Sequence, residues 1–207
     1  MILINLILSC LKVESMFEDF IQYKTNIKQG VGKLLISEPM LLDSNFQKTV
    51  IYLCNHSVKE SVGYVLNRLA SNDLSYYLPE LDGIQFPLFI GGPVGLNTLH
   101  FIHTESSKLG GDLIDQNIYW GGDLTTAIDL IKNAQLTPNQ CKFFLGYSGW
   151  GEGQLDAEMD MNSWIVGNAS DQLVLKTEHE QLWKKSIESL GDKFKNLLFI
   201  PKDPTLN

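Results

Sequence analysis

The chain has 207 residues, of which 44% are hydrophobic and 19% are charged, and its net charge is -8 with a sequence pI of about 4.9. This composition is typical of a soluble globular protein and excludes an intrinsically disordered chain, and the length predicts one domain or at most two. The acidity opposes binding to nucleic acid by the monomer, because such affinity comes largely from lysine and arginine.

Residues 1–29 are interpreted as an N-terminal extension with a helix from Val13 to Tyr23. An apolar run of about eight residues stands at the start, and no lysine or arginine precedes it, which argues against a signal peptide. The run is also far shorter than a membrane-spanning helix. Residues 30–207 contain no repeat and no linker-like composition, and we therefore expect them to form one domain.

The three cysteines, Cys10, Cys54 and Cys141, are too few and too widely spaced for a disulfide framework or a Cys-x-x-Cys metal or redox motif. This usage indicates a reducing compartment. We accordingly predict a cytoplasmic protein without membrane contact.

Strands dominate the first half of the chain. The run from Thr49 to Cys54 is continuously β-branched and apolar, which favours a buried central strand. Apolar runs and turn residues predict strands at 33–37, 49–54, 62–66, 86–90 and 98–103, and a short helix at 73–78.

The second half mixes both kinds of element. Asp123 is the expected N-cap of a helix that ends near residue 134, and Thr177 and Glu180 have the spacing of a capping box before a helix that Gly191 ends. Strands are predicted at 118–120, 141–147, 163–166 and 172–175, and a last apolar stretch covers 194–200.

These elements show no regular alternation of strand and helix. They therefore predict a single α+β domain built around a mixed or antiparallel sheet.

The least ordinary stretch is 146–154, Gly-Tyr-Ser-Gly-Trp-Gly-Glu-Gly-Gln. A nucleophile elbow at Ser148 would require glycine where Trp150 stands, and a dinucleotide loop would require glycine where Gln154 stands. The carboxylates that follow would repel a phosphate and suit the first turn of a helix. We interpret the stretch as a strand-to-helix turn.

Metal sites are also disfavoured. The acidic residues after 155 alternate as in a calcium loop, but Met161 replaces the required glycine and Gly167 the required glutamate. His100 and His103 face opposite sides of a strand and cannot share an ion. We predict no catalytic residue, no metal and no cofactor.

A ligand cleft is nevertheless possible where the glycine segments meet. The turn at 91–94 could line the same cleft as the 146–154 loop, with Asn67 as a third wall. The candidate residues are Asn67, Gly91, Gly92, Pro93, Tyr147, Gly149, Trp150, Gly151, Gly153, Gln154, Asp156 and Glu158.

Five motifs occur in a fixed order: Gly32-Lys-Leu-Leu-Ile-Ser-Glu-Pro39, Gly63-Tyr-Val-Leu-Asn-Arg68, Gly91-Gly-Pro-Val94, Phe144-Leu-Gly-Tyr-Ser-Gly-Trp-Gly-Glu-Gly-Gln-Leu-Asp-Ala-Glu158 and Asn162-Ser-Trp164. Together they resemble the YqgE/AlgH family of bacterial proteins from about Gly30 to Ile200. The chain departs from the family pattern at Leu69, Glu152 and Asp156.

The resemblance implies an α+β domain whose bifurcated sheet folds into a pseudo-barrel. It implies no established biochemical activity, and the family's label as a transcriptional regulator tied to alginate production describes genetics rather than mechanism. Two hypotheses remain open. One is a non-enzymatic regulatory or interaction protein with a protein or small-molecule partner; the other is an enzyme with Asp156 or Glu158 as base and Asn67, Tyr147 or Gln154 as polar contacts.

Overall fold

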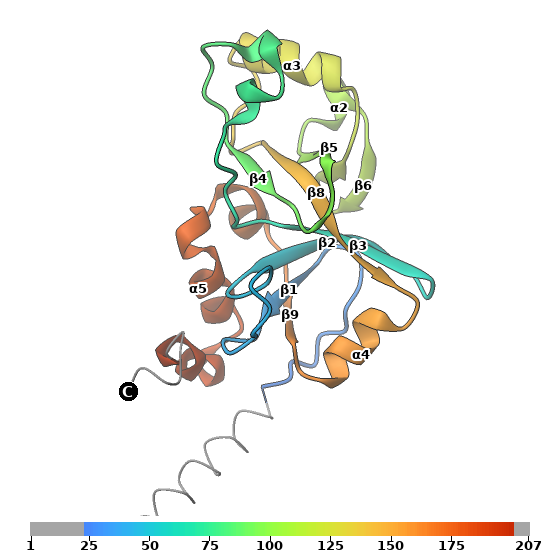
Figure 1. Cartoon of the computed structure of the whole chain (residues 1–207), viewed down its shortest axis with the longest axis vertical. Helices are drawn as coiled ribbons and strands as arrows, with labels where there is room; N and C mark the ends of the chain where they lie inside the picture. Colours follow the sequence, from blue (N-terminus) through green and yellow to red (C-terminus); the bar gives the residue numbers. More distant parts are fainter. Residues whose placement is uncertain (1–22, 201–207) are drawn as a thin grey trace, which may run out of the picture.

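The computed structural model describes residues 23–200, and the helix predicted at 13–23 lies almost wholly outside them (Figure 1). The described chain forms one sheet with strand order β6-β7-β5-β8-β3-β2-β1-β9, and β4 pairs with β8 beside this path. The strands are β1 (Lys33–Ser37), β2 (Val50–His56), β3 (Glu60–Val65), β4 (Leu88–Ile90), β5 (Val94–His103), β6 (Asp112–Asp115), β7 (Ile118–Trp120), β8 (Cys141–Gly151) and β9 (Trp164–Asn168).

The long strand β8 divides this sheet into two half-sheets. Its first part pairs in antiparallel fashion with β5 and in parallel with β4, and its last part pairs with β3. We call β4, β5, β6 and β7 the upper half-sheet and β1, β2, β3 and β9 the lower half-sheet, as they stand in Figure 1. The predicted α+β domain with a mixed, bifurcated sheet is therefore confirmed.

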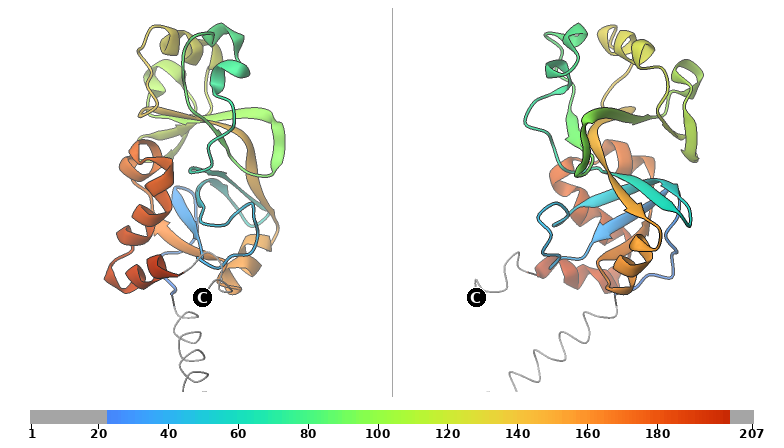
Figure 2. Two further views of the ribbon diagram at one scale, coloured as in Figure 1. Left: turned by 60° about the vertical axis from the view of Figure 1, so that its left-hand side comes forward. Right: turned by 45° about the vertical axis from the view of Figure 1, so that its right-hand side comes forward.

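Helices cover both half-sheets (Figure 2). Helix α5 and α4 lie on opposite faces of the lower half-sheet, because their buried residues belong to two different hydrophobic clusters of that sheet. The helical elements are η1 (Leu74–Tyr76), η2 (Pro79–Leu81), α2 (Ser106–Leu109), α3 (Leu124–Lys132), α4 (Gln154–Asp160), η3 (Gln172–Lys176), α5 (His179–Ser189) and η4 (Asp192–Phe199).

Strand β1 shows why the lower half-sheet is so apolar. Its side chains alternate between the faces, with Leu34 and Ile36 toward α5 and Leu35 toward α4, and all three are fully buried. A sheet covered on both faces needs a continuous apolar run of this kind, and each such side chain contributes about 1.5–3 kcal/mol of burial.

The prediction of a strand at 172–175 is wrong. These residues form the π-helical turn η3, whose Val174 and Leu175 pack into the core under α5. A short apolar run cannot be assigned to strand or helix by periodicity alone. Thr177 also does not cap α5, because its hydroxyl donates to the Gln172 carbonyl, 2.7 Å away, and closes η3 instead.

Two further differences from the prediction concern the C-terminal apolar stretch and an edge strand. The apolar stretch at the C-terminal end is the 3-10 helix η4, and the edge strand β6 was not predicted. Asp123 caps α3 as expected, since its carboxylate accepts the Thr126 N–H at 2.8 Å.

Within residues 23–200, no helix has the length and apolarity that crossing a membrane requires.

Candidate functional site

The glycine-rich segment is the end of β8 and the start of α4. Gly149 and Gly151 still belong to the strand, where they oppose Val62 and Glu60 of β3. Gly153 then adopts a left-handed conformation with φ of 68°, and α4 begins at the next residue. Glycine has no Cβ to strain in that conformation, so the segment turns the chain sharply from strand to helix.

The Gly91-Gly92 turn packs directly on β8 just before this point. The Gly91 N–H donates to the Leu145 carbonyl at 2.8 Å, and the Ser148 hydroxyl donates to the Gly91 carbonyl at 3.1 Å. A Cβ on Gly92 would collide with the Tyr147 carbonyl. These glycines therefore allow two backbones to touch, and the contact is closed rather than hollow.

Asn67 is fully engaged with the backbone. Its Nδ2 donates to the Lys48 carbonyl at 2.9 Å, and its Oδ1 accepts the Val50 N–H at 3.0 Å. The side chain thus provides hydrogen-bond partners for two backbone groups at the start of β2, and both its amide nitrogen and its amide oxygen are engaged.

Glu158 is the centre of the most specific polar cluster in the segment. Its Oε2 accepts the indole N–H groups of Trp150 at 2.9 Å and Trp164 at 2.7 Å, and its Oε1 accepts the Gln154 amide at 3.2 Å. We call these four residues the α4 corner. Hydrogen bonds to an ionised acceptor are the strong ones, so the corner fastens α4 to strands β8 and β9.

The other polar residues of the segment also have partners. The Gln154 Oε1 accepts the Gly151 N–H at 3.2 Å, which closes the turn into α4. The Asp156 Oδ1 accepts an N–H from Gln29 at 2.7 Å, which ties the N-terminal part of the described chain to the helix.

The predicted cleft residues fall into separate groups. Trp150 lies in the cluster under α4, whereas Tyr147 packs toward the α5 face, with its ring 5.9 Å from that of His100. The structure brings the α4 corner together and places the 91–93 turn against Tyr147. Asn67 lies apart from both, just after β3. None of the twelve residues lines the grooves of about 430 Å³ beside η4 or about 560 Å³ between residues 69–73 and 85–88.

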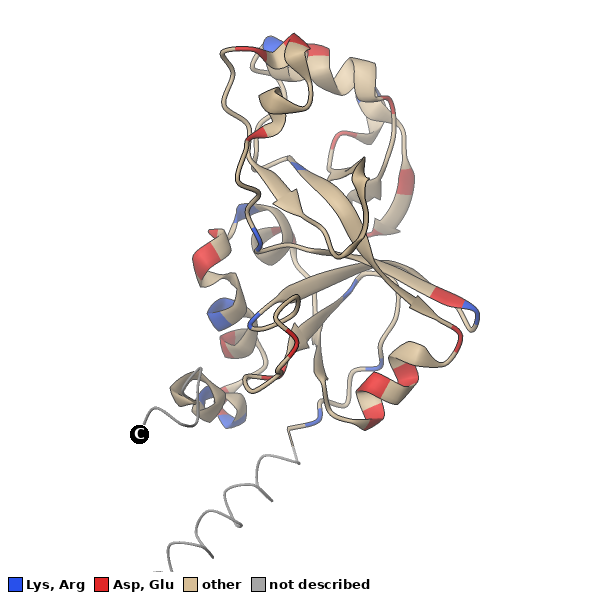
Figure 3. Cartoon of the chain, in the orientation of Figure 1, with Lys and Arg blue, Asp and Glu red and all other residues tan. Residues whose placement is uncertain are grey.

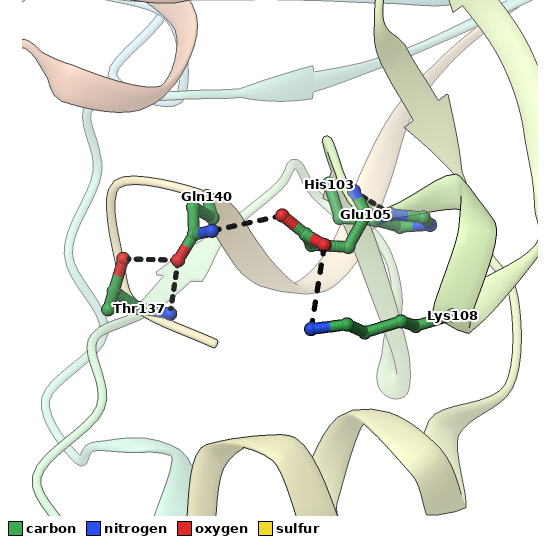
Figure 4. A network of polar contacts seen from close by, with 5 residues as sticks. All are labelled: His103, Glu105, Lys108, Thr137 and Gln140. Carbon is green, nitrogen blue, oxygen red and sulfur yellow. Dashed lines mark hydrogen bonds and ion pairs between the residues drawn. The ribbon is translucent and has the colours of Figure 1, made fainter. Parts of the chain in front are cut away.

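A polar network in the upper half-sheet was not predicted as a unit (Figure 4). Buried His103 holds two loops, because its Nε2 donates to the Gly121 carbonyl at 2.8 Å and its Nδ1 accepts the Glu105 N–H at 3.0 Å. Burial lowers the pKa of His103, against smaller opposing effects of Gly121 and Glu105. The ring is therefore neutral and structural. The available signal was Gly111 and Gly122, where an added Cβ would lie 3.2 Å and 3.4 Å from the His103 Nε2.

Lys142 is the second residue that sequence reasoning missed. It is only 4% exposed near the start of β8, its Nζ lies 3.4 Å from the Leu66 carbonyl, and the same Nζ lies 4.5 Å from the centre of the Phe89 ring. Burial lowers the pKa of Lys142 to about 8, with a smaller opposing effect of Glu178. The signal was a lone lysine within the apolar run 141–145.

A family model described as AlgH-like matches residues 34–195. A UPF0301 protein of Chlorobium limicola is 37% identical over 177 residues, which cover 85% of this chain and 95% of that protein. A UPF0301 protein of Cytophaga hutchinsonii is 37% identical over 178 residues, covering 85% of this chain and 98% of that protein.

The chain belongs to the AlgH-like UPF0301 family. The matched region contains the 91–93 turn and the whole α4 corner, so both are parts of the family domain.

Two solved structures share the fold of this family. Protein DIP2367 of Corynebacterium diphtheriae superposes with a TM-score of 0.73 at 18% identity, over 88% of this chain and 98% of that one. AlgH of Pseudomonas aeruginosa has a TM-score of 0.65 at 24% identity, over 84% of this chain and 98% of that one.

Proposed function

We propose that this protein is a non-enzymatic regulatory protein that acts in the cytoplasm by binding a protein or small-molecule partner. The observation that supports this most is that the Glu158 carboxylate is engaged in hydrogen bonds within the protein. A general base must present a lone pair to a substrate proton, but three of the roughly four acceptor positions of this carboxylate already face N–H groups of the protein. Two of them come from tryptophans that are 96% buried and cannot turn away without unpacking the core.

The remaining polar groups of the segment support the same proposal. Asn67, Gln154 and Asp156 all bond to other parts of the chain rather than converging on a common point. Catalytic groups need a place about 3 Å from several of them at once where a reacting atom can sit.

Direct contact with DNA is not part of the proposal. The net charge is -8, and Figure 3 shows acidic residues along α4. A transcriptional effect would then pass through a partner, and a gel-shift assay at physiological salt is expected to show no retardation of DNA.

A binding experiment tests the proposal directly. The tagged full chain is used to recover partners from cytosol of the source organism, and each candidate is remeasured with purified components. A ligand thermal-shift screen is run in parallel. Reproducible stoichiometric binding in either arm is the expected result.

Two matched variants ask whether the acidic face of α4 takes part in any protein interaction. Glu152→Lys with Asp160→Lys reverses two exposed charges at α4, and Glu80→Lys with Asp129→Lys reverses two exposed charges near α3. Both variants change the net charge equally. Loss of binding in the first alone would place the interface at α4.

Turnover would contradict the proposal. If the purified protein hydrolyses or isomerises any compound of a broad substrate panel, and Glu158→Gln abolishes turnover while the protein stays folded, the protein is an enzyme.

A further inference from the structure

A groove of about 430 Å³ lies where the turn between α5 and η4 approaches one edge of the lower half-sheet. We call it the η4 groove. Its lining comes from the segments 25–27, 168–170 and 189–194, and η3 adds Leu173. Sites for small molecules commonly enclose about 300–1,000 Å³, so the groove is large enough for a small ligand.

Part of this lining is apolar. Ala169, Leu173 and Leu190 are partly buried and pack against the hydrophobic cluster that α5 covers. Phe194 is buried in the same cluster and also lines the groove. We call these four residues the apolar wall. An aliphatic chain that lies along the wall removes apolar surface from water on both partners, which favours binding.

Lys193 gives the η4 groove its charge, because none of the other described residues that line the groove is charged. Its Nζ lies 4.8 Å from the centre of the Phe194 ring, so the ammonium stands beside the apolar wall. The other lysines of α5 and η4 form ion pairs at 3.9, 3.2 and 2.6 Å, namely Lys184, Lys185 and Lys195. Lys193 forms no ion pair within residues 23–200.

Asn168 adds a polar group and brings a second lysine to the groove. Its Oδ1 accepts an N–H from the Lys33 Nζ at 3.0 Å, which leaves its Nδ2 as a donor. Asp171 carries the carboxylate closest in sequence to Asn168, and this carboxylate accepts an N–H from Asn117 at 2.9 Å instead. Two ammonium groups that form no ion pair among the described residues therefore border the groove, in a chain whose net charge is -8.

We propose that the η4 groove binds a small amphiphilic carboxylate, with the carboxylate at Lys193 and an aliphatic chain along the apolar wall. The inference rests on the proposed function and assigns the small-molecule partner a chemical class. The carboxylate supplies the ion pair that Lys193 does not make within the described chain, and charge-assisted hydrogen bonds are the stronger polar contacts. One lysine with one amide donor suits a head group of a single negative charge. An aliphatic amine fits the apolar wall equally well but meets ammonium groups of its own sign.

An NMR titration of the full 207-residue chain with octanoate gives the direct readout. Backbone amide signals of the apolar wall are expected to shift and to reach saturation. Octylamine, which has the same chain length, should bind about tenfold more weakly or worse. Each CH₂ removed between octanoate and butyrate should weaken binding about two- to fourfold, because less apolar surface leaves water.

Two lysine variants test the role of Lys193. Lys193→Met and Lys176→Met remove the same charge at exposed positions, but only Lys193 lines the groove. Lys193→Met is expected to raise the Kd for octanoate about tenfold, and Lys176→Met less than about twofold. Circular dichroism of both variants checks that they remain folded.

Several results would overturn the inference. Equal affinity for octanoate and octylamine, or an unchanged Kd in Lys193→Met, would show that the groove does not select a carboxylate. Shifts confined to the groove between residues 69–73 and 85–88 would place the ligand elsewhere. Nuclear Overhauser contacts from residues 1–22 or 201–207 to Leu190 in the ligand-free protein would show that the chain itself fills the η4 groove.

Failure of this inference can be told apart from failure of the proposed function. If octanoate does not bind but the binding experiment above recovers a partner, only the carboxylate site is wrong. If a substrate is turned over with Glu158 as base while octanoate still binds at Lys193, the non-enzymatic role is wrong and the carboxylate site stands.

Discussion

The α4 corner and the surroundings of Lys142 adjoin opposite ends of β8 and differ in how they pair their buried polar groups. In the corner, every oxygen of Glu158 faces an N–H donor. At Lys142, the buried ammonium has one long contact to a carbonyl and an aromatic ring beneath it. The conspicuous glycine-rich motif therefore contributes to the stability of the fold through the α4 corner. The inconspicuous Lys142 is instead expected to lower that stability.

Removal of the Glu158 carboxylate is the largest expected effect. Glu158→Ala leaves two indole N–H groups and the Gln154 amide without their acceptor, and we expect the free energy of unfolding to fall by about 3 kcal/mol. Asp160→Ala on the same helix is the matched control and should change it by less than about 0.5 kcal/mol. Urea unfolding measures both, and equal losses would show that the Glu158 carboxylate does not hold the α4 corner together.

Replacement of Lys142 is expected to act in the opposite direction. Lys142→Met keeps the volume and removes a poorly paired buried charge, so the free energy of unfolding at pH 7 should rise by about 2 kcal/mol. A loss of stability would show that the ammonium is better satisfied than its contacts indicate. Lys108→Met, at a side chain that is 46% exposed, is the control and should be nearly neutral.

The same lysine sets a pH dependence. The folded pKa of Lys142 is lowered to about 8, so the unfolded state binds more protons between about pH 8 and the unfolded pKa of about 10.5. Stability of the wild type should therefore rise with pH across this window, and Lys142→Met should flatten the rise. Unfolding at several pH values in that range measures the slope.

His103 gives a smaller effect on the acid side. Because burial lowers its pKa in the folded state, the unfolded state binds the extra proton as the pH falls below about 6.5, and stability should fall with it. Protonation also removes the Nδ1 acceptor of the Glu105 N–H. His103→Gln should reduce the slope of unfolding free energy against pH below about pH 6.5, and an unchanged slope would contradict this account.

Gln154→Ala is expected to have the smallest effect of the series. It removes the bond to the Gly151 N–H and one of the three donors to Glu158, both at a solvent-exposed position, and should cost about 1 kcal/mol. Glu152→Ala is the neighbouring control. A loss as large as that of Glu158→Ala would mean that the amide, rather than the indoles, holds the corner.

Much of the fold could be predicted because its signals are local. The apolar run of β1 and the Asp123 cap of α3 each depend on residues close together in the chain. The π-helical turn η3 could not be predicted, because its short apolar run has no period that separates strand from helix.

The candidate site was less predictable than the fold. The motif placed Trp150, Gln154 and Glu158 on neighbouring turns of the chain, but it did not show that the carboxylate meets the indole of Trp164 on another strand. Nor did it show that β8 continues to Gly151, which puts Tyr147 and Trp150 on opposite faces of that strand. Contacts across strands depend on register, which a single sequence does not contain.

Hydrogen exchange of the indole N–H groups of Trp150 and Trp164, followed by NMR in the wild-type protein, tests the structural role of the α4 corner most directly. If Glu158 is a structural acceptor for both indoles, the two N–H groups should exchange together and only through large-scale opening, with protection close to that of the core strands. Fast, independent exchange would show that the carboxylate is free, and it would return Glu158 to the candidates for catalysis.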